Sequence, residues 1–486
     1  MNMTGLRNAL QGCILTDTEA DRLDVPGLKI DSRLIKEGDA FVAISGYDVD
    51  GHDYIEEAVA RGAGIVIGEK PLSLKVPYIQ VLDSRDCLAK LAAAFYNYPS
   101  ENHKIIGITG TNGKTTCSYM IRHILKTAGK TCSLIGTISY IINEVELSPE
   151  NTTPNSLKLQ EMLAESRDEY VVMEISSHAL DQSRVEGLQL DLGLFTNLSH
   201  DHLDYHHTME EYFQVKSKMF SYLKVRGMAV INTLDPYGQR LALQLETGDA
   251  AVKILGRRGS DLSLGKLDGS SFAFWMGGAE YFVHLNMPGI HNVYNAALSI
   301  LACVEAGISV ELAISAMSSF SGVPGRFEIF SHPSGGTFVI DYAHTEDAIE
   351  SCLETIEEMG AKRIIHILGF RGGRDVSKRK RMLRASARYS SKILLTGDDR
   401  NGLSAAQETE GLIKAAESAG VKAEIIADRT LAIKEAWGQV KEGDIVLLSG
   451  KGPERYKEKY WLPAESDREV LNYLLTDSLP GITADS

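Results

Sequence analysis

Gly107-Ile108-Thr109-Gly110-Thr111-Asn112-Gly113-Lys114-Thr115-Thr116 is the most informative segment of this 486-residue chain. It overlaps an apolar run at residues 105–108 and leads into a predicted helix at about residues 114–127. Its glycines allow backbone N–H groups to close around phosphate oxygens. Lys114 would reach the β- and γ-phosphates of a nucleotide, and the Thr115 hydroxyl would ligate Mg²⁺. The segment therefore predicts an ATP-binding loop between a strand and a helix.

The length of the chain predicts about three domains, because one hydrophobic core does not grow to 486 residues. Residues 1–100 mix short β-rich runs with one helical stretch, which predicts a small α/β domain. Residues 101–325 contain the phosphate loop and predict an ATP-binding domain with a mostly parallel sheet. Residues 326–486 show a new alternation of apolar runs, which predicts a Rossmann-like, doubly wound domain. The fold class is therefore α/β.

Short apolar runs mark the strands that we expect. The first domain has one at residues 40–44, with a helical stretch at 54–61. In the central domain, the further runs are at residues 170–173, 192–195 and 228–231. In the last domain, they are at residues 338–340, 363–368, 393–395, 424–426 and 445–448.

The composition is that of an ordinary globular protein, with 44% hydrophobic and 24% charged residues. A net charge of −15 argues against general nucleic-acid binding. No apolar run approaches the roughly 18 residues that span a bilayer, and the N-terminus lacks a signal-peptide pattern. The six cysteines are scattered without a C-x-x-C pair, as in proteins of a reducing compartment. We therefore expect a cytoplasmic monomer that binds neither nucleic acid nor membrane.

Further motifs resemble the Mur ligase family, whose relatives include the folylpolyglutamate synthases. The phosphate loop differs from the general pattern, because Ile108 stands where that pattern has its first glycine, and this T-G-T-N-G-K-T-T variant is similar to the family's loop. The other matching motifs occur in the family's order, and they are Asp31-Ser32-Arg33, Asn151-Thr152-Thr153-Pro154, Glu174-Ile175-Ser176-Ser177-His178, Phe195-Thr196-Asn197-Leu198, Asp201-His202-Leu203-Asp204, Asp341-Tyr342-Ala343-His344 and Gly450-Lys451-Gly452.

The resemblance implies an ATP-dependent amide ligase of peptidoglycan precursor synthesis, a process on which cell shape and division depend. Such an enzyme phosphorylates the carboxylate of UDP-MurNAc-L-Ala-D-Glu, and the amine of L-lysine or meso-diaminopimelate then attacks the acyl phosphate. Within the family, the motifs are most similar to the ligase that makes this tripeptide. Asp31-Ser32-Arg33 and Asn151-Thr152-Thr153-Pro154 argue against the ligase that adds D-Ala-D-Ala and against a folylpolyglutamate synthase. A paralogue with another acceptor or amino acid is the alternative.

Two Mg²⁺ sites follow from the same resemblance. Glu174 would hold one ion together with Thr115, and His202 would bind the second, although imidazole is not the usual ligand of so hard an ion. Lys216 resembles the lysine that the family carries as a carbamate, and Lys218 competes with it by sequence. The histidines clustered between residues 178 and 207 leave zinc as a second possibility. An ATP-driven switch, the rival from another class of protein, needs one Mg²⁺ and no second site.

The resemblance also implies two groups of binding residues. The residues for ATP are Gly110, Thr111, Asn112, Gly113, Lys114, Thr115, Thr116, Asn292, Asn295, Arg326 and Asp341. The residues for the UDP-linked dipeptide are Ser32, beside the loop Tyr47-Asp48-Val49, and Asn151, Thr152, Thr153, Ser176, Gln182 and Arg184. The guanidinium fork of Arg184 suits a carboxylate or a phosphate.

The incoming amino acid would be selected in the last domain. Arg374 resembles the arginine that holds its carboxylate, Glu454 resembles the acid that meets its distal amine, and Gly450 belongs to the same site. The selector reads Asp398-Asp399-Arg400-Asn401, where diaminopimelate enzymes show D-N-P-R and lysine enzymes often show D-D-P-N. Asn401 favours lysine, whereas Arg400 offers a positive charge, and Pro453 replaces a common histidine. The selector therefore leaves the amino acid open.

Overall fold

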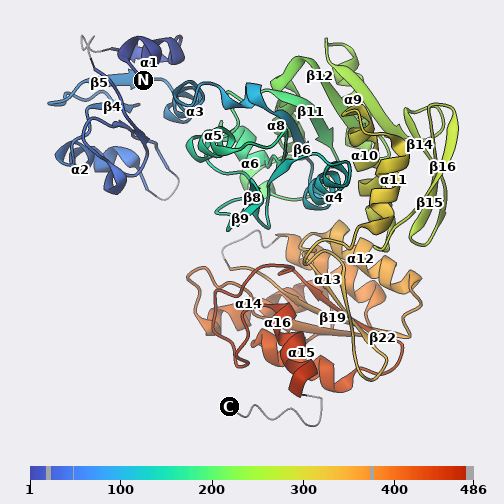
Figure 1. Ribbon diagram of the computed structural model, residues 1–486. Helices are drawn as coiled ribbons and strands as arrows, with labels where there is room; N and C mark the ends of the chain where they lie inside the picture. The colour runs from blue at the N-terminus through green and yellow to red at the C-terminus, as the bar shows by residue number, and fades with distance from the viewer. Residues whose placement is uncertain (18–22, 47–48, 373–376, 478–486) are drawn as a thin grey trace, which may run out of the picture.

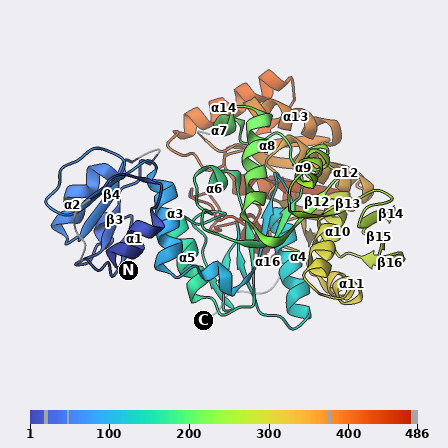
Figure 2. The same cartoon turned by 90° about the horizontal axis from the view of Figure 1, so that it is seen from above.

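The computed structural model describes residues 1–17, 23–46, 49–372 and 377–477. Three α/β parts follow one another along the chain, and each is built around its own sheet. In the view of Figure 1 the N-terminal part lies beside the central part and the C-terminal part lies below it; Figure 2 shows the same arrangement from above. Within the described residues, no helix combines the length and the apolar character that crossing a bilayer requires. The α/β fold class is confirmed, and the boundaries at residues 100 and 325 stay predictions.

The N-terminal part has a five-stranded sheet in the order β1-β5-β4-β3-β2, in which β1 alone is antiparallel. Its helices cover a small apolar core of their own. The elements are α1 Met3–Ala9, β1 Ile14–Thr16, β2 Leu28–Lys29, η1 Ser32–Leu34, β3 Ala40–Val42, η2 Gly51–Tyr54, α2 Ile55–Ala60, β4 Ile65–Gly68, β5 Tyr78–Val81 and α3 Ser84–Phe95.

The central part holds an eleven-stranded sheet in the order β16-β15-β14-β13-β12-β11-β6-β10-β7-β8-β9. The strands from β14 to β7 are parallel, and antiparallel strands extend the sheet at both edges. The strands are β6 Lys104–Thr109, β7 Cys132–Ile135, β8 Tyr140–Ile142, β9 Val145–Leu147, β10 Tyr170–Glu174, β11 Leu190–Phe195, β12 Leu223–Asn232, β13 Ala251–Gly256, β14 Leu262–Asp268, β15 Ser271–Met276 and β16 Ala279–His284. The helices are η3 Pro99–Asn102, α4 Lys114–Thr127, α5 Ser156–Glu165, α6 Ser177–Asp181, α7 Leu203–His206, α8 Met209–Ser217, η4 Lys218–Tyr222, α9 Pro236–Glu246, α10 Ile290–Glu305 and α11 Val310–Ser319.

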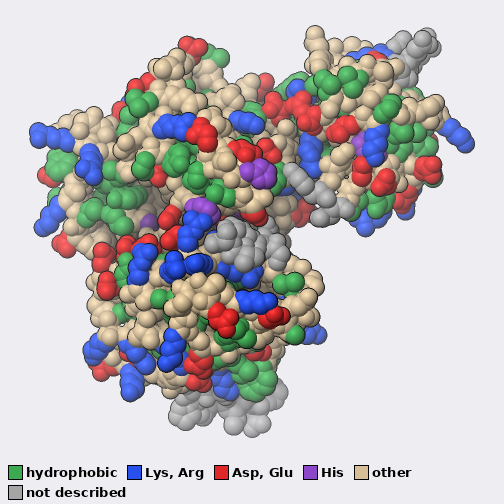
Figure 3. All heavy atoms as spheres, turned by 180° about the vertical axis from the view of Figure 1, so that it is seen from behind, with side chains coloured by type: hydrophobic (Ala, Val, Ile, Leu, Met, Phe, Trp, Pro, Cys, Tyr) green, Lys and Arg blue, Asp and Glu red, His purple; other side chains and the backbone are tan. Residues whose placement is uncertain are grey.

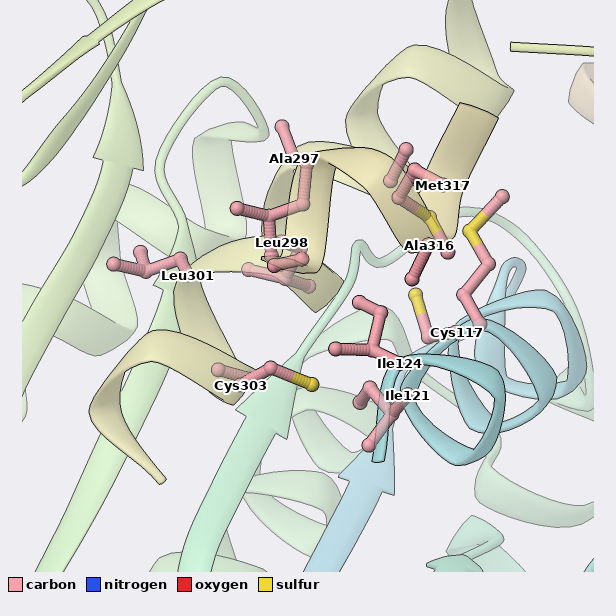
Figure 4. Packing of buried hydrophobic residues seen from close by; sticks show 14 of the residues in the cluster. Cys117, Ile121, Ile124, Ala297, Leu298, Leu301, Cys303, Ala316 and Met317 are labelled. Atoms are coloured by element: carbon pink, nitrogen blue, oxygen red, sulfur yellow. The ribbon is translucent and has the colours of Figure 1, made fainter. Parts of the chain in front are cut away.

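Helix α4, which begins at Lys114, is held rigidly by its apolar face. Ile121 and Ile124 of α4 pack against α10 and α11, and the buried thiols of Cys117 and Cys303 lie in the same cluster (Figure 4). Each fully buried aliphatic side chain stabilises the fold by about 1.5–3 kcal/mol. Because the phosphate loop ends at this helix, the packing of α4 fixes the position of the loop.

The C-terminal part has a six-stranded sheet in the order β17-β18-β22-β19-β20-β21, and β17 alone is antiparallel. This is the doubly wound arrangement that the sequence predicts, with helices on both faces. The elements are β17 Glu328–Ser331, β18 Thr337–Asp341, α12 Glu346–Glu358, β19 Arg363–Gly369, α13 Ser377–Tyr389, β20 Lys392–Thr396, α14 Ala405–Ala419, β21 Glu424–Ile425, α15 Arg429–Gln439, β22 Asp444–Ser449 and α16 Asp467–Asp477.

His366 on β19 is fully buried between two serines. Its Nδ1 lies 2.7 Å from Ser386 Oγ and its Nε2 lies 2.8 Å from Ser449 Oγ. Burial lowers the pKa of His366 to about 3, well below the usual value of a histidine. At pH values between about 3 and the usual histidine pKa of about 6.5, the unfolded chain binds a proton that the folded chain does not. The stability of the fold therefore falls as the pH falls through this range.

We expect this histidine to make the fold sensitive to acid. The free energy of unfolding should fall by about 2 kcal/mol between pH 7 and pH 5 because of His366. His366→Asn does not titrate, so the variant should lack this part of the pH dependence. Urea unfolding of both proteins at the two pH values measures the difference. Equal pH dependence in the two proteins would show that His366 does not contribute.

Candidate active site

A cleft of about 750 Å³ lies where the central and C-terminal parts meet. It brings together most of the residues that the sequence implicates: Thr111, Asn112, Gly113, Lys114, Thr115, Thr116, Asn151, Thr152, Glu174, Ser176, Arg184, His202, Asn292, Asn295, Arg326, Asp341, Asp398 and Gly450. Others lie outside its lining, and these are Ser32, Gly110, Thr153, Gln182, Lys216, Asp399, Asn401 and Glu454. Arg374, Tyr47 and Asp48 fall outside the described residues.

The phosphate loop is held open by its glycines and by strand β11. Gly110 and Gly113 have φ angles of +144° and +88°, and a Cβ at either one would clash, with Thr196 and Asn295 respectively. Asn197, just after β11, accepts the backbone N–H groups of Thr111 and Asn112, each at 2.9 Å. Only glycine fits at these two loop positions, which explains the spacing in the sequence.

The amine of Lys114 is hydrogen-bonded to the backbone of the phosphate loop. Its Nζ donates to the carbonyl oxygens of Gly110 and Thr111, at 2.8 and 2.9 Å. Burial lowers the pKa of Lys114 below the usual value of a lysine amine. The amine therefore lies where it can exchange these carbonyl groups for phosphate oxygens.

Glu174 lines the cleft next to the phosphate loop. It is the last residue of β10, it is fully buried, and its Oε2 accepts the hydroxyl groups of Thr115 at 2.9 Å and Thr137 at 2.8 Å. The backbone N–H of Thr137 donates to its Oε1 at 3.0 Å. A buried carboxylate surrounded by hydroxyl groups offers the hard oxygen donors that Mg²⁺ prefers, so these residues fit that ion.

Lys216 lies directly behind the phosphate loop. It is on α8, its side chain is buried, and its Nζ donates to the same Gly110 carbonyl as Lys114, at 2.8 Å. Burial, followed by the charge of Lys114, holds the pKa of Lys216 well below the usual range of a lysine. Lys218, its competitor by sequence, is exposed. The structure therefore separates the two lysines by burial.

The histidines between residues 178 and 207 do not form a closed metal site. His202 lines the cleft, its Nε2 lies 3.5 Å from Asp201 Oδ2, and burial lowers its pKa to about 3. His206 is buried and stacks on Tyr212. Among the described residues, no group of three or more His, Cys, Asp or Glu side chains is placed to hold a metal ion.

The residues predicted for the UDP-linked dipeptide separate into two places. Arg184 lines the cleft, and its guanidinium donates to the Thr153 carbonyl at 3.0 Å and to Gln182 Oε1 at 2.7 Å. Thr153 itself is buried, with its hydroxyl on the Glu174 carbonyl. Ser32 lies in the N-terminal part, where its hydroxyl donates to Glu57 at 2.7 Å.

Arg326 connects the central and C-terminal parts. Its Nη2 donates to Thr115 Oγ1 at 3.1 Å, and its guanidinium lies 4.5 Å from the ring centre of Tyr342. Asp341 ends β18 and accepts the backbone N–H groups of Phe327 and Ala343, both at 2.7 Å. These contacts place the start of the C-terminal part against the phosphate loop.

Asn292 and Asn295 line the same cleft from α10. Asn292 Nδ2 donates to the Pro288 carbonyl at 2.7 Å, and Asn295 lies against Gly113 of the phosphate loop. Helix α10 thus forms the wall beside the loop.

The side chains of the selector motif point in different directions. Asp398 and Asp399 are buried and share the amine of Lys451, at 2.8 and 2.5 Å. Asn401 points away, because its Nδ2 donates to the Gly372 carbonyl at 2.9 Å and it does not line the cleft. Arg400 pairs with Glu408 at 3.2 Å.

Several site residues escaped the sequence analysis. Thr137, Lys378 and Arg371 line the cleft, although none of them stands in a motif that signals a ligand. Asp201 pairs across the cleft with Lys378 at 3.3 Å and with His344 at 3.6 Å. Figure 3 shows Lys and Arg side chains gathered with histidine along the boundary of the two parts. Such a cationic boundary suits a polyanionic substrate, and a signal for it lay in the basic run at residues 378–381.

Three models of Mur ligase domains match the chain: the family's catalytic domain over residues 24–96, its middle domain over 108–303 and its glutamate ligase domain over 325–452. A protein of Geobacillus kaustophilus is 39% identical over 452 residues, which cover 89% of this chain and 91% of the relative. A protein of Aquifex aeolicus is 41% identical over 444 residues, with coverage of 89% and 90%. The chain therefore belongs to the Mur ligase family. The predicted class, an ATP-dependent ligase rather than a switch, is confirmed.

Both of these relatives carry the name UDP-N-acetylmuramoyl-L-alanyl-D-glutamate–2,6-diaminopimelate ligase. A solved structure with that name is 26% identical, with a TM-score of 0.67 and coverage of 98% of this chain and 99% of that one. The MurF ligase of Thermotoga maritima, solved in complex with ADP, has a TM-score of 0.63 at 22% identity and covers 88% of this chain and 94% of its own. This MurF structure has the same fold as the present chain.

Proposed function

We propose that this protein joins a diamino acid to UDP-MurNAc-L-Ala-D-Glu through an acyl phosphate, with conversion of ATP to ADP and phosphate. The observation that carries the proposal is the single cleft that gathers the phosphate loop, Arg184 and Asp398 from separate segments of the chain. Three reactants have to meet for such a ligation, and this cleft has a face for each of them. The names of the relatives support the same acceptor.

The roles of the residues follow from their contacts. Lys114 leaves the Gly110 carbonyl to bind the phosphates, and Arg326 approaches from the C-terminal part. Thr115 and Glu174 would hold one Mg²⁺, and His202 the second. The ions would offset the charge of the phosphoryl group during its transfer to the carboxylate. The closed cleft would then keep water from the acyl phosphate until the amine attacks.

Lys216 is the residue that we assign to carbamylation. A neutral lysine amine adds CO₂ to form a carbamate and releases one proton, and burial of Lys216 favours the neutral amine. The carbamate is an anion, so it suits a site with two divalent cations and a second lysine. The carbamate nitrogen keeps one N–H, which can still donate to the Gly110 carbonyl.

The test is a phosphate-release assay with UDP-MurNAc-L-Ala-D-Glu, ATP and Mg²⁺. We expect release only when meso-diaminopimelate or L-lysine is added, with the tripeptide as product by mass spectrometry. A chelator of Mg²⁺ should abolish the product. ATP hydrolysis without amide formation, for every amine tried, would refute the proposed function.

A further inference from the structure

Strand β16 forms one edge of the central sheet, and Figures 1 and 2 both place it at the rim of the molecule. It has six residues, whereas the strands at the other sheet edges of the described chain, β1, β2, β9, β17 and β21, have two to four. Its register with β15 has no bulge, and its sequence contains neither Lys nor Pro. Native proteins normally shorten an edge strand or protect it with such features, because its open N–H and C=O groups can pair with another strand. The edge at β16 has none of these protections.

The pairing of β16 with β15 shows which of its backbone groups are open. Leu285, just after β16, donates its N–H to the Ser270 carbonyl at 2.9 Å, in register with the two strands. Backbone groups alternate between the two sides of a strand, so those of Glu280, Phe282 and His284 point away from β15. The side chains of these three residues share one face of the strand and are exposed, that of Phe282 at 69%. Both the backbone and the side chains of these residues are therefore accessible to a partner.

We propose that β16 docks a second copy of this chain, as an antiparallel strand pair with its two-fold axis at Phe282. In this register the backbone of Phe282 bonds reciprocally to Phe282 of the partner subunit. The backbone of Glu280 bonds in the same way to His284 of the partner subunit. The pairing joins the two central sheets into one and uses every open group of the three residues. A homodimer of this kind replaces the monomer that the sequence favours, and it does not depend on the proposed function.

The argument for a second copy is that β16 is complementary to itself. Residues directly opposite in an antiparallel pair have neighbouring side chains, so Glu280 lies beside the imidazole of His284 of the partner subunit. His284 Nδ1 is 2.9 Å from Ser271 Oγ, which leaves Nε2 to donate to that carboxylate. On the axis, the two Phe282 rings cover each other. The other edge of the same sheet is not complementary to itself, because a two-fold axis at the centre of β9 would set two Glu146 carboxylates against each other.

The first experiment measures the mass of the full chain by light scattering over roughly 1 to 100 µM, the range expected for a small interface. The mass should rise from 53.2 kDa towards twice that value. Cysteine cross-linking under mild oxidation then tests the register, since the six native cysteines are buried. Phe282→Cys should link to its own copy across about 5.5 Å between Cα atoms. Glu280→Cys alone should not, because about 13 Å separates it from its own copy, but it should link to His284→Cys in a mixture of the two variants.

Two substitutions compare the two edges of the sheet. Phe282→Lys sets like charges against each other on the axis and should weaken the dimer by about tenfold or more. Val145→Lys makes the same kind of change on the exposed strand β9 and should leave the dimer unchanged. Both variants should keep the circular dichroism of the wild type, because both side chains are exposed. A constant mass of 53.2 kDa up to 100 µM overturns the inference, and so does a dimer that Phe282→Cys fails to cross-link or that Val145→Lys weakens equally.

Discussion

Glu174→Gln is expected to lower the rate of ligation by about 10³-fold, while the protein still folds. Glutamine has the same shape as glutamate, and its amide oxygen can still accept from the hydroxyl groups of Thr115 and Thr137. What is lost is the negative charge, the second carboxylate oxygen that accepts the backbone N–H of Thr137, and with them the oxygen donor that we assign to Mg²⁺. The measurement is kcat for phosphate release, together with the melting temperature of the variant.

The matched control is Glu169→Gln. Glu169 immediately precedes β10, whereas Glu174 ends it, and the side chain of Glu169 pairs with Lys104 and Lys130 at the surface. Exposed pairs contribute about 0–1 kcal/mol, so this variant should keep the rate of the wild type. If Glu174→Gln retains more than a tenth of the wild-type rate at saturating Mg²⁺, Glu174 is not a metal ligand.

Lys216→Ala is expected to lower ligation by roughly 10²- to 10³-fold, through loss of the anion that the carbamate supplies beside the metal ions. Alanine leaves a buried space behind Gly110, lined by the ring of Tyr212. A short carboxylic acid such as acetate or propionate can enter that space and replace the missing anion. We therefore expect partial recovery of the rate with increasing carboxylate concentration, measured as phosphate release.

Lys218→Ala is the control for this prediction, because Lys218 is exposed two residues further along the chain. Its rate should match that of the wild type, with or without added carboxylate. Recovery of Lys216→Ala by a short amine, and not by a carboxylate, would mean that the lysine acts as an ammonium. Full activity of the variant would exclude any role of Lys216 in the reaction.

The sequence predicted the elements with local signals well. The predicted helix at residues 114–127 agrees with α4, and the apolar runs at 170–173 and 363–368 lie within β10 and β19. The strands β14, β15 and β16 were missed; β14 is parallel to β13, and β15 and β16 extend the sheet in antiparallel pairing. Asp268-Gly269 and Gly277-Gly278, on either side of β15, are hairpin turn signals, but they do not show which sheet the hairpin strands extend. An edge strand is specified by its pairing partner, which sequence periodicity does not reveal.

Contacts between distant segments were the harder part of the site. Asn401 was predicted to select the amino acid, and its side chain donates to the Gly372 carbonyl outside the lining of the cleft. Arg371 was not singled out, since a lone arginine in a glycine-rich turn has no partner until Glu454 is brought beside it. The selector role of Asn401 stays an untested prediction.

The amino-acid sequence alone predicted the ATP-binding loop, because such a loop needs glycine at Gly110 and Gly113 and an amine at Lys114. The ligase class came from the resemblance of this loop and the further motifs to the Mur ligase family. The tertiary structure alone decided which lysine is buried and which arginine faces the cleft. Burial of Lys216 and pairing of Arg371 depend on segments far apart in sequence, whose meeting lowers the dielectric constant around one charge and brings an opposite charge beside the other.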